Sequence, residues 1–337
     1  MFMLETKTTT SRTASRPSNP QSPKKISLGI IGLGKMGANL ALQAVEKNIA
    51  VIGKARSRKP ELEQKGVKVV DDYQTFVSYL GHPRVIYLSL PAGATVDTVL
   101  DELLPHLERG DVVMDGGNSF YMDSIRREKE IFEKGIYFLD CGTSGGLEGA
   151  RQGACFMVGG RDAGIKIAEP ILKTLSINED GYVYTGQPGS GHFVKLVHNG
   201  IEFGMLQSIG EGVALLMQGN GFQLDIAQIF KNWSNGSVIR GWLVELMEKG
   251  LREQDFEKIQ SYVEDTGEVN WLVQDAINKE IPIPVISQSV MELFKSRSKD
   301  SDVYKSVVLM RHGFGGHPFG KDQYIAQERK TSRIARV

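Results

Sequence analysis

The stretch that decides the fold is residues 26–37, which read ISLGIIGLGKMG. The first half is a short apolar strand, and the second half fits G-x-G-x-x-G, followed by a helical pattern through Val45. In this setting the glycines allow a tight turn, the approach of a pyrophosphate and close packing of helix on strand. A glycine turn without a ligand is the alternative that this setting disfavours. The sequence predicts a dinucleotide site at the helix N-terminus, made of Gly32, Leu33, Gly34, Lys35, Met36 and Gly37.

The end of the next expected strand, residues 50–53, bears on which dinucleotide binds. An NAD site usually places Asp or Glu here to hold the ribose 2′-hydroxyl. This chain instead has Lys54, Arg56 and Ser57. A guanidinium suits a 2′-phosphate because it donates paired, charge-assisted hydrogen bonds. We therefore predict NADP rather than NAD as the cofactor, recognised by Arg56 and Ser57.

Strands and helices alternate from there to about residue 186. The expected strands are 67–70, 85–88, 112–114, 136–139 and 155–158, and the expected helices are 72–80, 95–104, 122–133 and 163–175. This alternation predicts an α/β Rossmann-type doubly wound sheet, with ligands beyond the carboxyl ends of its strands.

Polar loops follow two of these strands. Asn118 comes after two glycines, and residues 143–146, Thr-Ser-Gly-Gly, follow the strand expected to end at Leu139. Because Asn, Ser and Gly also favour ordinary turns, each loop alone fits either a binding role or plain turn chemistry.

The longest helical pattern begins in the turn of residues 189–191, with Ser190 as its expected N-cap, and runs to about residue 218. Lys195, His198, Asn199 and Glu202 follow i, i+3, i+4 and i+7 spacing, so they share one stripe of this helix. A solvated polar face is the plain alternative.

Two glycines argue against that alternative. Gly200 and Gly204 lie inside the helix, where each costs about 1 kcal/mol relative to alanine. They make sense if another backbone or a ligand approaches closely.

Helical patterns then continue over 223–231, 237–249, 255–263, 268–279 and 284–297. The segment 311–317 is basic and glycine-rich, which suits either an anion site or an exposed tail. We expect a disordered tail over 1–24, a dinucleotide-binding domain over 25–187, an all-α C-terminal domain over 188–320 and a C-terminal tail over 321–337.

Composition narrows the class of protein. The chain has 337 residues, 41% of them hydrophobic, and 40 basic residues balance 40 acidic ones, so bulk charge gives no support for nucleic-acid or membrane binding. No apolar run reaches transmembrane length. We expect Cys141 in a loop and Cys155 in a strand, both as free thiols. Residues 1–24 fit a floppy tail better than a transit peptide, which favours a cytoplasmic location.

These motifs together resemble the 6-phosphogluconate dehydrogenases, the decarboxylating branch of the β-hydroxyacid dehydrogenase superfamily, over about residues 26–320. The resemblance is carried by residues 32–37, by 114–119 (MDGGNS), by 142–146 (GTSGG) and by 191–202 (GHFVKLVHNGIE). The chain length and the GTSGG motif resemble the short bacterial-type form.

The resemblance implies oxidative decarboxylation of 6-phosphogluconate to ribulose 5-phosphate and carbon dioxide, a step of the pentose phosphate pathway, without a metal. Lys195 would be the base that takes the proton of the 3-hydroxyl, and it must be neutral to do so. Glu202 would protonate the resulting enediol, which calls for an apolar setting that Ile201 and Phe203 could provide.

The resemblance also implies the other ligand contacts. Leu90, Pro91 and Ala92 would line the cofactor, and Asn118 would lie between nicotinamide and substrate. Asn199 would act with Lys195 and Glu202 in catalysis. The implied substrate contacts are Asn118, Ser144, Gly145, Gly146, His198, Asn199, Phe203, Thr266, Arg311 and His317. The last two would come from a neighbouring subunit, which implies a homodimer or homotetramer.

Three positions depart from the family pattern around the substrate phosphate. Phe203 replaces the usual Tyr, Glu264 replaces a Lys of the long forms, and Leu293 replaces an Arg, with Arg297 one turn further on. The resemblance therefore predicts the chemistry at carbons one to three more strongly than it predicts a phosphate on the substrate.

Two other functions stay open. A non-decarboxylating dehydrogenase of the 3-hydroxyisobutyrate type would share the glycine motif and the lysine helix, but generally not Glu202. A cofactor-binding sensor without turnover would have no use for Lys195, Asn199 and Glu202.

Overall fold

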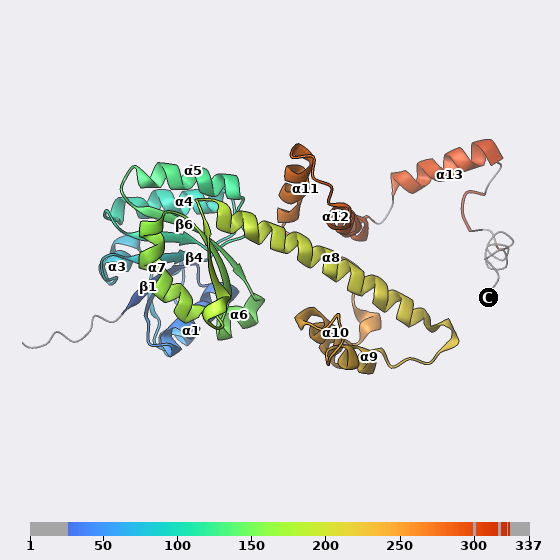
Figure 1. Cartoon of the computed structure of the whole chain (residues 1–337), viewed down its shortest axis with the longest axis horizontal. Helices are drawn as coiled ribbons and strands as arrows, with labels where there is room; N and C mark the ends of the chain where they lie inside the picture. Colours follow the sequence, from blue (N-terminus) through green and yellow to red (C-terminus); the bar gives the residue numbers. More distant parts are fainter. Residues whose placement is uncertain (1–25, 299–300, 316–317, 322, 324–337) are drawn as a thin grey trace, which may run out of the picture. The chain divides into compact units, whose positions relative to one another are not determined.

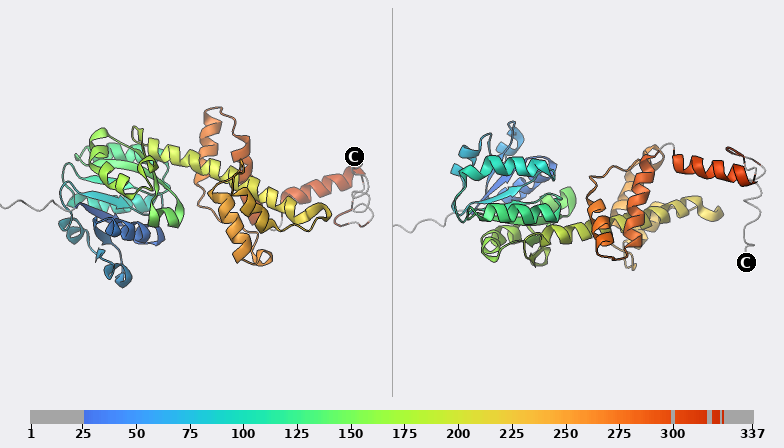
Figure 2. Two further views of the ribbon diagram at one scale, coloured as in Figure 1. Left: turned by 60° about the horizontal axis from the view of Figure 1, so that its bottom comes forward. Right: turned by 90° about the horizontal axis from the view of Figure 1, so that it is seen from above.

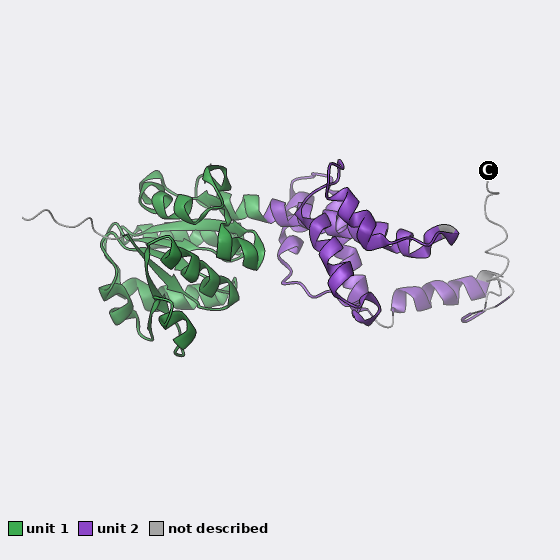
Figure 3. Ribbon diagram, turned by 90° about the horizontal axis from the view of Figure 1, so that it is seen from below, with its two compact units in different colours: residues 1–195 green, residues 196–337 purple. Residues whose placement is uncertain are grey.

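The computed structural model of the chain describes residues 26–298, 301–315, 318–321 and 323. Two units can be distinguished, one ending at Lys195 and the other beginning at Leu196 (Figure 3). The disordered tail expected over residues 1–24 lies outside the described residues.

The first unit is built on a single sheet with the order β3-β2-β1-β4-β5-β6-β7-β8 (Figure 1). Neighbouring strands are parallel except β6 and β7, which are antiparallel. The strands are β1 (Ser27–Ile31), β2 (Ala50–Lys54), β3 (Lys68–Val70), β4 (Val85–Leu88), β5 (Val112–Asp115), β6 (Tyr137–Ser144), β7 (Cys155–Gly159) and β8 (Tyr182–Gly186).

Helices cover both faces of this sheet (Figure 1). They are α1 (Lys35–Glu46), α2 (Pro60–Glu63), α3 (Tyr73–Ser78), α4 (Ala94–Leu103), α5 (Tyr121–Phe132), α6 (Gly146–Gln152) and α7 (Asp162–Leu175). Along β1, Leu28 and Ile30 join the core under α1 and α7, whereas Ile31 joins the core under α3, α4 and α5. The doubly wound sheet expected from the alternating pattern is confirmed.

Two local expectations for this unit were wrong, and two elements were not expected at all. Strand β6 continues past Leu139 to Ser144, because residues 140–144 pair with β7 after the pairing with β5 has ended. Cys141 therefore lies in a buried strand and not in a loop. Helix α6 and strand β8 were not anticipated.

The second unit is helical. Helix α8 (Ser190–Gln218) begins in the first unit, and α9 (Ile226–Trp233), α10 (Trp242–Glu253), α11 (Glu268–Asn278), α12 (Pro284–Arg297) and α13 (Asp302–Gly315) follow (Figure 2). The all-α C-terminal part is confirmed. Short 3-10 helices occur at Leu104–His106, Glu179–Gly181, Gly219–Gly221 and Phe256–Lys258.

Glycines of α8 allow two helices to pack closely against it. A Cβ at Gly200 would lie 2.4 Å from the Leu272 side chain of α11 and 3.2 Å from Ile286 of α12, and a Cβ at Gly204 would lie 3.3 Å from Val285. The close approach inferred from these glycines is therefore a helix–helix contact. Further along α8, Val213 packs in a small core with Phe230 and Val244.

One expectation for this unit was also wrong. The helix expected over 255–263 is only a 3-10 turn, because the backbone of Val263 bonds to side chains of α12: its N–H donates to Ser296 and its carbonyl accepts from Arg297. The basic segment, for which an anion site and an exposed tail were both open, is helical up to Gly315, as part of α13.

Candidate functional site

The glycine turn after β1 has the features of a dinucleotide cradle. Gly32 has φ +95°, and a Cβ there would lie 2.3 Å from the Ser89 carbonyl oxygen. A Cβ at Gly37 would lie 2.0 Å from the Gly32 carbonyl oxygen, so this glycine is required for α1 to pack on the turn. Leu33 is buried, whereas Lys35 is exposed and Met36 is half-buried.

Gly34 differs from these two glycines. It is the N-cap residue of α1, it is exposed, and a Cβ there would meet nothing within 4 Å. No side chain caps α1, and its first turn carries no acidic residue. Packing within the chain does not require this glycine, but a phosphate approaching the open N-terminus does. The turn therefore fits a dinucleotide.

Arg56 and Ser57 are exposed just after β2. Arg56 makes no hydrogen bond or ion pair within the described part of the chain, although it lies close enough to Tyr73 to affect that hydroxyl. Burial, followed by a hydrogen bond to Glu102, raises the pKa of Tyr73 to about 12. The ammonium of Lys54 lies 4.3 Å from the centre of the Tyr73 ring. The guanidinium is thus available to an anionic group at the end of β2.

The ends of β1, β4 and β5 meet at one edge of the sheet. Ser89 N–H donates to the Ile31 carbonyl at 2.8 Å, and Gly116 N–H donates to the Leu88 carbonyl at 3.0 Å. A Cβ at Gly117 would lie 2.8 Å from the Leu90 carbonyl oxygen, so the loop after β5 touches the loop after β4. Leu90 and Ala92 are half-buried, and Pro91 and Asn118 are exposed at this edge.

Lys195 reaches the same edge of the sheet. The pairing of β5 with β6 ends at Asp115 and Asp140. Gly142 lies two residues after Asp140, beyond the last residue of β6 that pairs with β5. A Cβ at Gly142 would lie 2.6 Å from Cβ of Lys195. Lys195 is buried, with 7% of its surface exposed. Nearby, Ser144 ends β6 and Gly145 and Gly146 begin α6, both glycines with positive φ.

The N-terminus of α8 is seated directly on the sheet. A Cβ at Gly191 would lie 2.3 Å from the Asp140 carbonyl oxygen and 2.5 Å from that of Met157. The buried Asp140 carboxylate accepts hydrogen bonds from Gly189 N–H at 2.7 Å and from His192 N–H at 2.9 Å. Asp140 thus does the capping that we expected of Ser190, whose hydroxyl instead bonds to Thr185.

In the second unit, a buried carboxylate joins two of the predicted substrate residues. Glu268 accepts a hydrogen bond from Asn199 Nδ2 at 3.4 Å and another from the Thr266 hydroxyl. Asn199 is 4% exposed and Glu268 is 9% exposed. The Asn199 side-chain oxygen lies 3.2 Å from His198 Nδ1. Glu268 therefore orients the amide and the hydroxyl together.

The setting of Glu202 differs from the expected one. Its side chain is 40% exposed and lies 3.9 Å from His198 Nδ1, and Ile201 beside it is 54% exposed. Phe203 is half-buried. The described residues therefore do not form the apolar environment that we expected around Glu202.

The residues expected near a substrate phosphate are only partly available. Arg297 donates to Asp265 at 2.5 Å and to the Val263 carbonyl at 2.7 Å, so its guanidinium is already paired. Glu264 is exposed and accepts a bond from Tyr262. Arg311 is exposed on α13, and His317 lies outside the described residues.

The buried charged residues to which sequence reasoning gave no role include Asp140, Glu268 and Arg127. None of these three lies in a motif with a recognisable spacing, and each bonds to a partner far away in the chain. Asp140 alone of the three stands out locally, as a charged residue after three apolar residues of β6, whereas Arg127 lies within a charged helix.

Comparison with known protein families gives two adjoining matches. The NAD binding domain of 6-phosphogluconate dehydrogenase matches residues 27–186, and the 6-phosphogluconate dehydrogenase C-terminal domain matches residues 191–336.

Individual relatives agree with these matches. YqeC of Bacillus subtilis is 41% identical over 293 residues, covering 86% of this chain and 98% of YqeC. The NAD(+)-dependent, decarboxylating 6-phosphogluconate dehydrogenase of Haloferax volcanii is 39% identical, covering 86% of this chain and 97% of that protein. The solved 6-phosphogluconate dehydrogenase of Plasmodium falciparum, studied with NADP+ and with 6-phosphogluconate, is 28% identical with a TM-score of 0.75, covering 88% of this chain and 66% of that one.

Proposed function

This chain belongs to the 6-phosphogluconate dehydrogenase family, and from that premise we propose that it oxidatively decarboxylates 6-phospho-D-gluconate to D-ribulose 5-phosphate and carbon dioxide, reducing NADP. The observation that carries the proposal is the buried Lys195, which packs on β6 at the sheet edge where the glycine turn and the Asn118 loop lie. The same helix carries Asn199 and Glu202.

The bound dinucleotide supplies the hydride acceptor. Lys195, which is buried, takes the proton of the 3-hydroxyl as the hydride leaves carbon 3, a step that needs the uncharged amine. The oxidised substrate is a β-keto acid. Its C1–C2 bond breaks, carbon dioxide leaves, and the electron pair forms the C2–C3 double bond of an enediol while Lys195 returns its proton to the oxygen on carbon 3.

Glu202 then protonates the former carbon 2, which becomes C1 of the product, while Lys195 takes the proton back from the oxygen on carbon 3, which becomes the ketone. Because Glu202 is half-exposed in the chain, the bound substrate must exclude water from this carboxyl for efficient transfer. Asn199 holds the substrate hydroxyls through an amide that Glu268 orients.

The test is a substrate panel in which 6-phosphogluconate, gluconate and 3-hydroxyisobutyrate are each offered with NADP and with NAD. We expect turnover with 6-phosphogluconate and one carbon dioxide per reduced cofactor. Reduced cofactor without gas would overturn the proposal in favour of a non-decarboxylating dehydrogenase. Lys195→Ala should lose about 10²–10⁴-fold in kcat and still bind NADP, which also excludes a sensor without turnover.

The preference for NADP rests on Arg56, which has no partner in the described part of the chain, and on the lack of an acidic residue at the end of β2. Arg56→Ala should raise the KM for NADP roughly 10–100-fold, since a charge-assisted bond contributes about 1.5–3 kcal/mol. The KM for NAD should stay unchanged. Arg58→Ala is the matched control, because that exposed arginine pairs with Glu63. Equal use of NAD and NADP by the wild type would refute the preference but not the reaction.

A further inference from the structure

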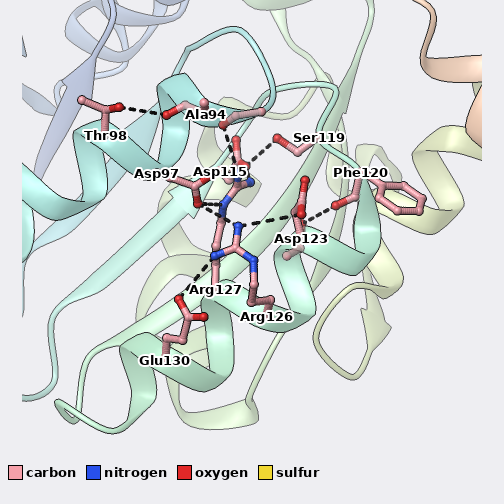
Figure 4. A network of polar contacts seen from close by, with 12 residues as sticks. Ala94, Asp97, Thr98, Asp115, Ser119, Phe120, Asp123, Arg126, Arg127 and Glu130 are labelled. Carbon is pink, nitrogen blue, oxygen red and sulfur yellow. Dashed lines mark hydrogen bonds and ion pairs between the residues drawn. The ribbon is translucent and has the colours of Figure 1, made fainter.

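Arg127 lies on α5 within a network of polar contacts (Figure 4). Its side chain is fully buried, with 1% of its surface exposed. A guanidinium is charged at any ordinary pH, so its burial is costly unless partners offset the loss of water. The positions of those partners show what this residue does.

The first partners lie at the start of α4. Arg127 Nε donates to Asp97 Oδ1 at 2.8 Å, and Nη2 donates to Asp97 Oδ2 at 3.0 Å and to the Gly93 carbonyl at 3.0 Å. Gly93 is the N-cap residue of α4, and Asp97 lies in its first turn. The hydrogen bonds to Arg127, ahead of other causes, lower the pKa of Asp97 to about 2. Arg127 therefore fixes the loop that joins β4 to α4.

The remaining guanidinium nitrogen faces the end of β5. Arg127 Nη1 lies 3.5 Å from Asp115 Oδ2, and it makes no hydrogen bond within the described part of the chain. The buried Asp115 closes the turn that follows it, since its carboxylate accepts from Ser119 Oγ at 2.7 Å and from Gly117 N–H at 3.1 Å. Asn118 is in this turn.

One guanidinium thus links two loops that also touch each other at Gly117 and Leu90. Both loops leave the carboxyl ends of neighbouring parallel strands, the edge where doubly wound sheets bind ligands. A shift of either loop would change the position of the other.

We propose that Arg127 is a positioning residue for hydride transfer: it holds the loop of Leu90, Pro91 and Ala92 and the loop of Asn118 in one arrangement around the reacting end of the cofactor. This inference rests on the proposed function. Arg127 does not itself touch substrate or cofactor, and its effect passes through Asp115 and Gly93.

The experiment compares Arg127→Lys with Arg126→Lys in the full-length protein. Arg126 is the matched control: it is next in the chain and donates to the same Asp97 oxygen at 2.9 Å. Its side chain is 44% exposed, and its contacts among the described residues are with Asp97, Asp123 and Glu130 only. Lysine keeps the positive charge at either position. It lacks the several N–H groups of a guanidinium, with which Arg127 reaches Asp97, the Gly93 carbonyl and Asp115 at once.

The readouts are the KM for the cofactor and the primary deuterium isotope effect with 6-phosphogluconate deuterated at carbon 3. We expect Arg127→Lys to lower kcat/KM about tenfold or more and to raise the isotope effect, because misplaced reactants slow hydride transfer relative to the other steps. Arg126→Lys should stay within about twofold of the wild type in both readouts. An unchanged isotope effect and cofactor KM in Arg127→Lys, with only a lower Tm, would reduce Arg127 to a scaffold residue and overturn the inference.

A milder variant decides the question if Arg127→Lys does not fold. Ser119→Ala removes the hydroxyl that Asp115 holds and loosens the same turn from its other side. It should raise the isotope effect in the same direction by a smaller amount, and no change would overturn the inference. Failure of the proposed function is distinguishable, because the wild type would then show no turnover of 6-phosphogluconate and there would be no isotope effect to compare.

Discussion

At the scale of single residues, the candidate site depends on buried carboxylates that hold other groups in place. Glu268 accepts from both Asn199 and Thr266, and Asp115 closes the turn that contains Asn118. A buried carboxylate can accept several hydrogen bonds at once, which makes it suited to fixing neutral side chains that would otherwise rotate. Two of the groups expected to contact ligands are thus positioned by these two carboxylates.

Glu268→Gln tests whether the Glu268 carboxylate positions Asn199 and Thr266, because it replaces a single oxygen of that group by nitrogen. The substitution keeps the size of the side chain but removes the charge and turns one acceptor oxygen into a donor. Asn199 and Thr266 therefore lose a charged acceptor, and one of the two hydrogen bonds must reverse its direction. We expect kcat/KM for 6-phosphogluconate to fall about tenfold, the equivalent of one hydrogen bond to a charged group. The Tm should change little.

Glu211→Gln is the control for that change, since Glu211 is exposed on α8 and accepts a hydrogen bond from Gln207, outside the residues proposed to bind substrate. It should leave kcat/KM near the wild-type value. A rise in kcat/KM for Glu268→Gln would contradict the positioning role and would show that the negative charge repels the anionic substrate.

At the scale of elements, α8 is the helix on which the site depends. Its N-terminus is seated on the backbone of β6 and β7 through Gly191 and is capped by Asp140. Its middle is held by α11 and α12 at Gly200 and Gly204. The position of Lys195, five residues after the start of the helix, follows from that capped end.

Asp140→Ala should lower stability by about 2–6 kcal/mol, because two buried N–H donors lose their acceptor and each costs about 1–3 kcal/mol. Hydrogen exchange of the Ser190–Lys195 amides should become faster, and kcat should fall. Asp72→Ala is the comparison: Asp72 caps α3 by accepting from Thr75 N–H at 2.7 Å. That variant should cost about 1 kcal/mol without affecting α8. Equal exchange rates at Ser190–Lys195 in Asp140→Ala and the wild type would contradict the capping role.

Two alanine substitutions in α8 should have opposite signs. Gly200→Ala places a methyl 2.4 Å from Leu272, and overpacking of about 1–3 kcal/mol outweighs the gain of about 1 kcal/mol in helix propensity. Gly210→Ala meets nothing within 4 Å, so it should stabilise by about 0.5–1 kcal/mol. Urea denaturation of both variants measures the difference. A loss at Gly210 would mean that something outside this chain packs there.

At the scale of the whole molecule, the proposed reaction uses residues along one helix, α8, at which the two units divide. Lys195 ends the first unit and Asn199 and Glu202 belong to the second, although one helix carries all three. The second unit exposes large apolar side chains, among them Ile201, Met205, Leu206 and Leu215. An apolar surface of this kind is typical of an interface between subunits, which agrees with the proposal that Arg311 of one subunit completes the site of another.

Mixing two inactive variants tests that shared site. Lys195→Ala and Arg311→Ala should each be nearly inactive alone. If subunits exchange freely between dimers, half the dimers are mixed, and each mixed dimer has one intact site, so activity should return to about a quarter of the wild-type value. No recovery after verified subunit exchange would place Arg311 in the site of its own chain, and an active Arg311→Ala variant would place it outside any site.

Local sequence determined the sheet and the dinucleotide turn of this protein, because both are encoded by neighbouring residues. The apolar run of β1 and the glycines at 32, 34 and 37 lie within 12 residues, and the helix of Lys195 follows from a spacing of three and four residues. The end of β6 did not follow, since pairing with β7 extends the strand to Ser144.

Only the tertiary structure decided which groups hold the site together. Asp140 caps a helix that begins 50 residues later, Glu268 meets Asn199 across 69 positions, and Arg127 joins loops after two different strands. The physical reason is that a buried charge is tolerated only where the fold supplies its partners. Those partners come together through strand pairing and helix packing and leave no local spacing in the sequence.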